Sequence, residues 1–462
     1  MGRIKVSSVA WILIAAMMIP LLLTSCNLFG EEPSAPSVSD SDTAEENNET
    51  PKEEEPMKVG KIDESMLIRQ DGKLLKTAAG DTVYLRGINA GGVGALEGWM
   101  QVAFVNNTEL TSRSVTDLLM DRFGYEKTLE FWEEYRKNWW NDADFKNCKD
   151  MGINVIRLPI TYMQVDPGAN KGLMYAGKQY DFSMIDDFVT RAAEYGIYTI
   201  IDLHGAYGSQ NGLDHSGEVL NAANCDFYYN NRKMQLTVDL WRAMAEHFKD
   251  NPAVAGYDVL NEPGQKLEGG YISATKKIHW DFMDRLYKAI REVDQNHLVI
   301  IETMWTPNDL PDPKDYGWEN IMYSMHNYTE CYGNDNFEKH KSTIDNKVSQ
   351  MVNCTYNVPW QMGEFTCYDN KAQWEYTLNA FNEAGIHWCN WNYKLNNTNH
   401  PMRFWGAVNI SAYGKIDLVN DSYEEILANL VVFRTDGEYA SLPRFSDGTS
   451  FSSVMKKYAK QK

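Results

Sequence analysis

The stretch VAGYDVLNE, Val254–Glu262, runs through apolar residues, ends on an amide and a carboxylate, and is followed at once by Pro263. An apolar run of this length is typical of a buried strand. Its end has an ordinary explanation, because Asn and Pro are common turn residues and a Glu at a strand end is usually solvated. Glu262 is therefore either part of an ordinary turn or a reactive carboxylate. The side chains that lie beside it in the folded chain decide between the two.

Seven further apolar runs have the same character as Val254–Glu262. They alternate with segments whose apolar residues recur every three or four positions, as in Phe282–Val293 and Leu236–Phe248. Eight buried strands alternating with helices predict an α/β fold, a closed (β/α)8 TIM barrel, in preference to a doubly wound open sheet. The seven runs are Val83–Ala90, Asn154–Ile160, Tyr198–His204, His297–Glu302, Ile321–Tyr328, Val358–Phe365 and His387–Tyr393.

Additions to the minimal barrel are predicted at three places. Ala95–Asn147, between the first two strands, is the largest loop insertion, and Met66–Leu85 carries DG and GD turns that predict a small N-terminal β-hairpin at the bottom of the barrel. Ser422, followed three residues later by Glu425, predicts the start of a helix. We expect residues 65–462 to form one catalytic domain.

The N-terminal 64 residues have a different composition. Two basic residues, a short apolar run and the ending LTSC predict a signal peptide over residues 1–26, and LTSC resembles a bacterial lipobox in which Cys26 is lipidated. An ordinary secretory signal cut nearby is the alternative. Residues 27–64 are rich in Ser, Pro and Glu and predict a disordered acidic linker. We therefore expect an exported lipoprotein at the cell surface or facing the periplasm, bound to the membrane by its N-terminal lipid anchor only.

Charge and cysteine spacing limit the kinds of partner. The linker carries nearly half of the formal net charge of −20, and the remaining chain is mildly acidic with no basic stripe, so nucleic acid is not an expected partner. The cysteines beyond Cys26 have no C-x-x-C spacing, which argues against a zinc or redox site. We expect no metal, and a monomer.

Polar side chains end most of the predicted strands. In a TIM barrel the reactive groups lie where the strands end at the carboxyl face, so these side chains are expected to meet at one rim. Each alone has an ordinary explanation, a hydrogen-bonded core histidine or a solvated carboxylate, but their convergence favours a site. The set is Arg157, His204, Asn261, Glu262, His326, Tyr328, Glu364 and Trp391.

The two carboxylic acids of this set suggest glycosidic bond cleavage. A retaining glycosidase holds two carboxyl groups about 5–5.5 Å apart, one protonated to assist the leaving group and one ionised to attack the anomeric carbon. We expect the apolar strand around Glu262 to raise its pKa, and Arg157 and Tyr328 to hold Glu364 ionised. Asn261 is placed to bind a sugar 2-hydroxyl. Such chemistry needs only protons and carboxylates, so no cofactor is expected.

Five motifs carry a family resemblance. RLP at Arg157–Pro159, LHG at Leu203–Gly205, LNEP at Leu260–Pro263, HNY at His326–Tyr328 and GEF at Gly363–Phe365 together resemble glycoside hydrolase family 5, the cellulase-like family. The resemblance implies that Glu262 is the general acid/base and Glu364 the nucleophile. It also implies a shell around the sugar made by Arg157, His204, Asn261, His326, Tyr328 and Trp391.

Two longer stretches narrow the resemblance. LRGINAGGVGALEGWM, Leu85–Met100, and DLHGAYGSQNGLDHSG, Asp202–Gly217, are similar to the exo-β-1,3-glucanase branch, which implies that Glu97 touches the terminal sugar and that Asn211 belongs to the substrate-binding shell. The chain departs from that branch at Val93 and Gly94, and again at Leu213 and His215. Trp305 and Trp405 stay open between a structural role and stacking on sugars, whereas for Trp391 we favour stacking.

These observations favour a retaining β-glucan hydrolase that acts as an exo-β-1,3-glucanase or β-glucosidase. An endo-β-1,4-glucanase or mannanase is an alternative, and the products would distinguish the two. A surface glycan-binding lipoprotein that has kept the barrel and lost catalysis is a third interpretation, although both carboxylates and their shell are present.

Overall fold

The structure is a computed structural model that describes only part of the chain. The predicted signal peptide with Cys26, most of the predicted linker, and Trp305 lie outside the described residues. The chain divides into two units, Met1–Glu54 and Glu55–Lys462, and the described residues all belong to the second. They are 57–100, 104–105, 110–168, 180–221, 223–267, 270–272, 276–303, 306–328, 336–396 and 405–460.

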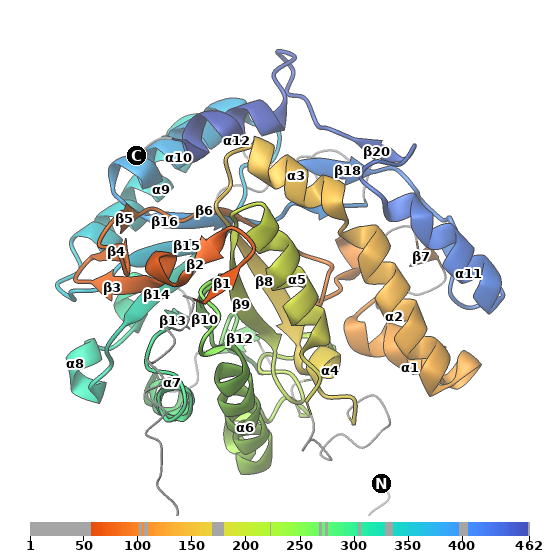
Figure 1. Cartoon of the computed structure of the whole chain (residues 1–462), viewed down its shortest axis with the longest axis horizontal. Coiled ribbons are helices and arrows are strands. Elements are labelled where there is room, and N and C mark those ends of the chain that lie inside the picture. Colours follow the sequence, from red (N-terminus) through yellow and green to blue (C-terminus); the bar gives the residue numbers. More distant parts are fainter. Residues whose placement is uncertain are drawn as a thin grey trace, which may run out of the picture. The chain divides into compact units, whose positions relative to one another are not determined.

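Eight parallel strands close into a barrel at the centre of this unit (Figure 1). Each of the eight predicted apolar runs coincides with one of them, with the second and third strands ending one residue beyond their runs, so the predicted TIM barrel is confirmed. Nearly every strand residue is buried, because helices cover the outside and side chains fill the inside. In order around the barrel the strands are β6 (Arg86–Asn89), β8 (Val155–Thr161), β9 (Tyr198–Gly205), β10 (Val254–Asp258), β13 (Leu298–Glu302), β14 (Ile321–Asn327), β15 (Trp360–Phe365) and β16 (His387–Asn390).

The helices predicted from apolar spacing are present. Phe282–Val293 falls mostly within α7 (Lys276–Arg291), and Leu236–Phe248 lies within α6 (Asn231–Phe248). Helices α5, α6 and α7 stand beside their strands in Figure 1. The other helices outside the largest insertion are α4 (Tyr162–Val165), α5 (Ser183–Glu194), α8 (Pro313–Tyr316), α9 (Phe337–Val352), α10 (Lys371–Glu383), α11 (Tyr423–Asn429) and α12 (Phe451–Ala459).

The predicted capping box at Ser422 is confirmed. The Ser422 hydroxyl accepts a hydrogen bond from the Glu425 backbone N–H, and the Glu425 carboxylate accepts one from the Ser422 N–H at 2.9 Å. Two otherwise unpaired donors at the start of α11 are thereby satisfied. Short elements complete this part of the chain: β17 (Lys394–Leu395), β18 (Val408–Ile410), β19 (Ile416–Asp417), η8 (Leu430–Phe433) and β20 (Ala440–Ser441).

The insertion predicted between the first two strands is mainly helical. Its aromatic residues hold the loop that follows β6: Tyr135 O–H donates to the Gly92 carbonyl at 2.9 Å, and Trp139 Nε1–H donates to the Gly91 carbonyl at 2.8 Å. That loop carries Glu97, so the insertion helps to position a predicted site residue. Its elements are η2 (Gly98–Met100), β7 (Phe104–Val105), α1 (Ser112–Phe123), α2 (Tyr125–Trp139) and α3 (Asp142–Asp150).

The predicted N-terminal hairpin is a three-stranded antiparallel sheet of β3 (Ile68–Asp71), β4 (Leu74–Thr77) and β5 (Thr82–Val83). Gln70 ties it to the barrel bottom, since its side-chain oxygen accepts from Ile321 N–H, the first residue of β14, at 2.8 Å. The position predicted for the hairpin is therefore confirmed.

One boundary of the predicted linker is wrong. Residues 57–64 are ordered: β1 (Lys58–Val59) pairs with β2 (Ile62–Asp63), and η1 (Glu64–Met66) follows. Ile62 is fully buried, and Lys61 N–H donates to the Ala193 carbonyl at the end of α5. The composition of the whole segment is disorder-like, but Ile62 and the partly buried Val59 pack its last part against the core.

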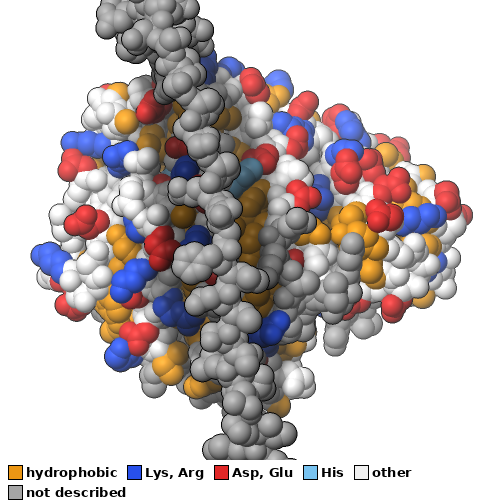
Figure 2. Space-filling model, turned by 60° about the horizontal axis from the view of Figure 1, so that its bottom comes forward, with side chains coloured by type: hydrophobic (Ala, Val, Ile, Leu, Met, Phe, Trp, Pro, Cys, Tyr) orange, Lys and Arg blue, Asp and Glu red, His pale blue; other side chains and the backbone are white. Residues whose placement is uncertain are grey.

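Charges of both signs are intermixed over the face drawn in Figure 2.

A short hairpin, β11 (Gln265–Leu267) and β12 (Gly270–Ile272), follows β10 and precedes α7 along the chain. Within the described ranges, none of the helices combines the length and the apolar character needed to span a bilayer.

Candidate active site

Polar side chains from three barrel strands meet at one point. Arg157 lies in β8, His326 in β14 and Glu364 in β15, and an irregularity in the register of β14 and β15 sets His326 directly beside Glu364. Gly363 makes this approach possible, because a Cβ there would lie 2.6 Å from Ser324 Oγ and 3.2 Å from His326 Nε2. The Gly of the GEF motif thus leaves room for the side chains of Ser324 and His326 on β14.

Glu262 reaches the same point from a turn after β10. Strand pairing ends at Asp258, and Glu262 has a positive φ of 38°, a conformation that costs a non-glycine residue energy. The turn is held from outside: Gln210 Nε2 donates to the Asn261 carbonyl at 2.8 Å, and Tyr228 O–H donates to the Pro263 carbonyl at 2.7 Å. The backbone therefore fixes the direction in which the carboxylate leaves the chain.

The two carboxylates predicted from sequence lie together. One oxygen of Glu262, one oxygen of Glu364 and a ring nitrogen of His326 are all within 4.8 Å of one another. His326 Nδ1 is 3.0 Å from Glu262 Oε1 and 3.4 Å from Glu364 Oε2. This separation is in the range of enzymes whose second carboxylate attacks the sugar directly, rather than the 6.5–9.5 Å, approximately, that leaves room for a water.

Glu364 is hydrogen-bonded at both oxygens. Arg157 Nη1 donates to Oε1 at 2.7 Å, and Tyr328 O–H donates to Oε2 at 2.6 Å. Charge-assisted hydrogen bonds of this kind are short and fix the orientation of the carboxylate. The expected contacts of Arg157 and Tyr328 with Glu364 are therefore present.

Arg157 is also the centre of a buried charge cluster. Its guanidinium lies 2.8 Å from Asp258, 3.0 Å from Asp202 and 3.8 Å from Glu302, besides its contact with Glu364, and it donates to Asn261 Oδ1 at 2.9 Å. One cation faces four carboxylates. Because isolated buried charges are costly, some of these carboxyl groups must hold protons.

The pKa values follow this imbalance. Burial raises the pKa of Asp202 to about 7 against the opposing effect of Arg157, and burial also raises the pKa values of Asp258 and Glu302. Burial lowers the pKa of His204 to about 3, so this ring is neutral and hydrogen-bonded to Asp202, with Nδ1 2.6 Å from Oδ2.

The expected pKa of Glu262 is wrong in direction. Burial alone would raise it, but the positive charges of His215 and His326 and the hydrogen bond from His326 outweigh burial and lower the pKa of Glu262 to about 2. The sequence indicated the apolar strand before Glu262. It did not indicate that a histidine would face each carboxylate oxygen, His326 at Oε1 and His215 at Oε2, 3.2 Å away.

The last residue of β9 and the loop after it, residues 205–217, form one wall of the site. This segment folds back tightly, since a Cβ on Gly205 would lie 2.5 Å from the Ser216 carbonyl oxygen. Asn211 is fully buried and supports the loop: its Oδ1 accepts from Ser216 O–H at 2.6 Å, and its Nδ2 lies 2.8 Å from His215 Nε2. Asn211 Nδ2 also donates to the Glu262 carbonyl at 3.3 Å, so Asn211 links this wall to the turn that carries Glu262.

Glu97 lies against the same wall. One oxygen of Glu97, one oxygen of Asp214 and a ring nitrogen of His215 are within 4.8 Å of one another, and Glu97 Oε2 accepts from Trp99 Nε1–H at 2.7 Å. Burial raises the pKa of Glu97, and the nearby Asp214 raises it further. The contacts of this group, and those of Glu262, His326 and Glu364, are accounted for by ion pairs and hydrogen bonds, and we assign a metal to neither.

Aromatic residues complete the site. Trp391 stacks on His204, with ring centres 5.2 Å apart and planes 9° apart, and Trp405 stacks on Tyr328 at 5.5 Å. Trp99 packs against Trp405 at 4.7 Å. Rings around a pair of carboxylates provide faces suited to the apolar sides of sugars.

Sequence reasoning missed Asp202, Asp258 and Glu302 as residues of the site, and it missed the contact of His215 with Glu262. The first three had a usable signal, because each is an acidic residue within or at the end of a predicted apolar strand, where an unpaired carboxylate is unexpected. His215 is a departure in the GSQNG loop, and the position of that loop predicts that His215 helps to close one end of the cleft. Its approach to Glu262 depends on how the loop folds back, and spacing does not reveal that.

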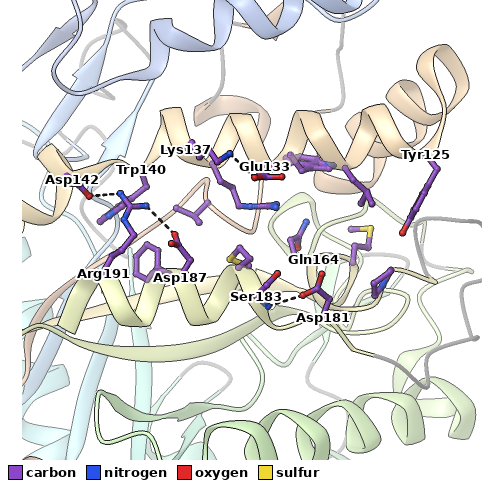
Figure 3. A pocket seen from close by; sticks show the side chains of 18 residues that line it. Tyr125, Glu133, Lys137, Trp140, Asp142, Gln164, Asp181, Ser183, Asp187 and Arg191 are labelled. Carbon is purple, nitrogen blue, oxygen red and sulfur yellow. Dashed lines mark hydrogen bonds and ion pairs between the residues drawn. The ribbon is translucent and has the colours of Figure 1, made fainter. Parts of the chain in front are cut away.

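A separate cavity of about 780 Å³ lies between α2 and α5, away from these residues (Figure 3). Several of its charged side chains pair with one another: Arg191 contacts Asp142 at 2.8 Å and Asp187 at 3.2 Å, and Lys137 contacts Glu133 at 2.7 Å. Arg136 also lines the cavity, and burial lowers its pKa to about 10. None of the predicted site residues lines it.

Comparison with known proteins identifies the family of the barrel and of its site residues. A family model described as Cellulase (glycosyl hydrolase family 5) matches residues 120–397, which is more than half of the chain and includes Arg157, Glu262, His326 and Glu364.

Two relatives illustrate the similarity in sequence. A protein named β-xylosidase from Phanerodontia chrysosporium is 30% identical over 265 residues, covering 57% of this chain and 52% of the relative. A protein named glucan 1,3-β-glucosidase 2 from Saccharomyces cerevisiae is 28% identical over 245 residues, covering 48% and 43%. The chain thus spans about half the length of these relatives.

A solved structure described as an endogalactoceramidase supports the fold. It superimposes with a TM-score of 0.55 at 19% identity, covering 79% of this chain and 84% of that one. At this identity the likeness concerns the barrel alone.

Proposed function

This chain belongs to glycosyl hydrolase family 5, and from that premise we propose that it cleaves β-glucosidic bonds with retention, using Glu364 as nucleophile and Glu262 as general acid/base. The observation that carries the proposal is the approach of the two carboxylates to within 4.8 Å. That distance suits a direct attack on the anomeric carbon.

In the first step a Glu364 oxygen forms a bond to the anomeric carbon while the glycosidic bond breaks and Glu262 gives a proton to the departing oxygen. Arg157 and Tyr328 hold the Glu364 carboxylate in a fixed orientation, so little reorganisation is needed at the moment of attack. In the second step Glu262 takes a proton from water, and that water displaces Glu364 from the sugar. A Glu262 carboxylate with a low pKa suits the second step. The first step requires a nearby proton.

For the substrate we propose β-1,3-glucan attacked from its end. Support comes from the relative named glucan 1,3-β-glucosidase 2 and from the wall formed by residues 205–217 and Glu97, which lies beside Glu262. A wall at one end of a cleft favours exo action, because no further sugar fits beyond the terminal one. An endo-β-1,4-glucanase or mannanase is the alternative. The relative named β-xylosidase makes xylosides a further class to include in the test.

The test is a product profile on β-1,3-, β-1,4-, β-1,6- and mixed-linkage glucans, mannan and aryl β-xylosides. Release of a single small sugar from β-1,3-glucan throughout the reaction is the expected result. An early spread of oligomers indicates endo action, and binding without turnover on every substrate indicates the non-catalytic glycan-binding interpretation.

For location we propose an exported lipoprotein anchored through Cys26, with the acidic segment before residue 57 as tether. The supporting features are the apolar run and the LTSC ending. Cys26→Ser should release the protein from the membrane fraction with its specific activity unchanged. Continued membrane association after this substitution counts against the lipid anchor.

A further inference from the structure

Glu302 ends β13 directly behind the catalytic pair. It is 1% exposed, and its Oε1 lies 3.3 Å from His326 Nε2, while Oε2 has only the distant contact with Arg157 at 3.8 Å. Neither His326 Nε2 nor Glu302 Oε2 has a hydrogen-bond partner among the described residues. Buried polar atoms without partners are rare in proteins, so this arrangement requires an explanation.

Neutralising Arg157 does not explain Glu302. Asp258, Asp202 and Glu364 all lie closer to that guanidinium, at 2.8, 3.0 and 2.7 Å. A fourth carboxylate adds buried negative charge and little attraction. The partner that distinguishes Glu302 from the other three is His326.

His326 presents its two nitrogens to different carboxylates. Nδ1 faces Glu262 and Glu364, and Nε2 faces Glu302. An imidazolium donates from both nitrogens, whereas a neutral ring has one donor and one acceptor. With acidic groups on both sides, the ring together with Glu302 holds two protons, one on Nδ1 and one between Nε2 and Glu302.

The other charges around the ring favour the same state. Burial lowers the pKa of His326, but Glu302, Glu364 and Glu262 more than offset it and raise the pKa to about 9. The same histidine contributes to the low pKa of Glu262. The charged groups that face His326 from the surrounding strands and turns are Asp202, Asp258, Glu262, Glu302 and Glu364, with Arg157 behind them.

Resting on the proposed roles of Glu262 and Glu364, we infer that Glu302 is a positioning residue: it fixes a proton at His326 Nε2, so that the proton on Nδ1 is the one exchanged with Glu262. Histidines elsewhere are oriented in the same way by a carboxylate at the second nitrogen. The residue was not predicted from sequence as part of the site.

The proton balance closes without another reactant. In the first step the Nδ1 proton moves 3.0 Å to Glu262 Oε1, and Glu262 passes a proton to the leaving oxygen. The ring is then neutral with its proton on Nε2, facing Glu302. In the second step the proton taken from water returns through Glu262 to Nδ1. The proton shared by Nε2 and Glu302 can instead begin on Glu302. It then shifts to Nε2 as Nδ1 gives up its proton, and the net transfer is the same.

The first test measures His326 itself and needs no substrate. Protein labelled with ¹⁵N in its nine histidines is titrated by NMR, and His326 is identified by the signal missing from His326→Gln. We expect His326 to stay charged through neutral pH, with a midpoint near the value of about 9, and to lose its proton at least about tenfold more easily, one pH unit lower, in Glu302→Gln. A neutral His326 at pH 7.5 in the unaltered protein overturns the inference, whether or not the variant folds.

Ser324→Ala is the matched control. Ser324 pairs in register with Glu302, is fully buried and carries no charge, so its loss perturbs the same layer without changing the electrostatics. We expect its His326 midpoint to match that of the unaltered protein. Equal midpoints in all three proteins contradict the role of Glu302.

The second test separates proton delivery from general damage. With phenyl β-glucoside, whose leaving group needs a proton, Glu302→Gln should lose about 10- to 100-fold in kcat/KM; with 2,4-dinitrophenyl β-glucoside, which needs none, the loss should stay within about threefold. Equal losses on both substrates overturn the inference. If the unaltered protein hydrolyses neither glycoside, the proposed function fails, and the NMR titration still decides the role of Glu302.

Discussion

The cavity between α2 and α5 and the site at the barrel mouth are both lined by aromatic and charged side chains, but their charges are matched differently. In the cavity Arg191 pairs with Asp142 and Asp187. Lys137 pairs with Glu133 and Glu134. All of these side chains are partly or largely exposed. At the mouth one fully buried arginine faces four buried carboxylates.

This difference separates a structural hollow from a reactive site. Exposed ion pairs contribute little and perturb pKa values little, because water screens them. Buried groups that outnumber their partners have shifted pKa values and hold protons, which general acid–base chemistry requires. An excess of buried carboxylates over cations, rather than volume, distinguishes the barrel mouth from this cavity.

The largest effect is expected at the nucleophile. Glu364→Gln removes the group that attacks the sugar and should lower kcat by about 10⁴-fold or more. Glu375→Gln, the same change on the outside of α10, is the control and should keep near-full activity. Residual turnover above about 1% in Glu364→Gln, measured with an activated aryl glycoside, would assign the attack to another residue.

A smaller loss is expected at the acid/base. Glu262→Ala should lower activity on natural glucan by about 10²- to 10⁴-fold, while an activated aryl glycoside should still glycosylate the enzyme. Azide, which needs no base, should restore the second step and give a glycosyl azide. A variant that is equally inactive on both substrates and not rescued by azide contradicts the role.

The unmatched charge itself predicts a pH dependence of stability. Burial raises the pKa of Asp202 from about 3.9 in an unfolded chain to about 7, so its contribution to stability is full below pH 4 and is lost as the pH rises through 7. Asp202→Asn resembles the protonated form and cannot lose that proton. Its unfolding free energy relative to the unaltered protein should therefore rise with pH between about 4 and 7, by about 1.4 kcal/mol per unit at most, and level off above 7. A difference that does not change from pH 5 to 9 in chemical denaturation contradicts the buried-charge account.

The smallest effect is expected in the cavity. Arg191→Ala breaks two partly exposed ion pairs and should cost about 1 kcal/mol of unfolding free energy or less, with kcat/KM within about twofold of the unaltered enzyme. A tenfold loss of activity would show that the cavity communicates with the mouth, and the comparison would no longer hold.

The barrel was predictable because its signal is local. Each strand is an apolar run with a helix-patterned segment after it, and the two periodicities are visible without knowledge of the packing. The chain positions of Glu262 and Glu364 followed as well, since strand ends on the same face of a barrel must converge.

What could not be predicted depends on contacts between distant segments. The low pKa of Glu262 arises from His215 and His326, which lie 47 residues before it and 64 residues after it in the sequence. The order of residues 57–64 depends on a backbone contact with Ala193. Neither follows from local composition, because burial and neighbouring charge exist only after the chain has folded.

The most direct test of the central claim is the identity of the covalent intermediate. The enzyme is incubated with a 2-deoxy-2-fluoro-β-glucosyl fluoride, digested at low pH and analysed by mass spectrometry for the modified peptide. The account predicts a fluoroglucosyl ester on Glu364, within the WQMGEF strand. A label on Glu302 or Glu97, or a single-displacement reaction that releases product of inverted configuration with no label, would contradict it.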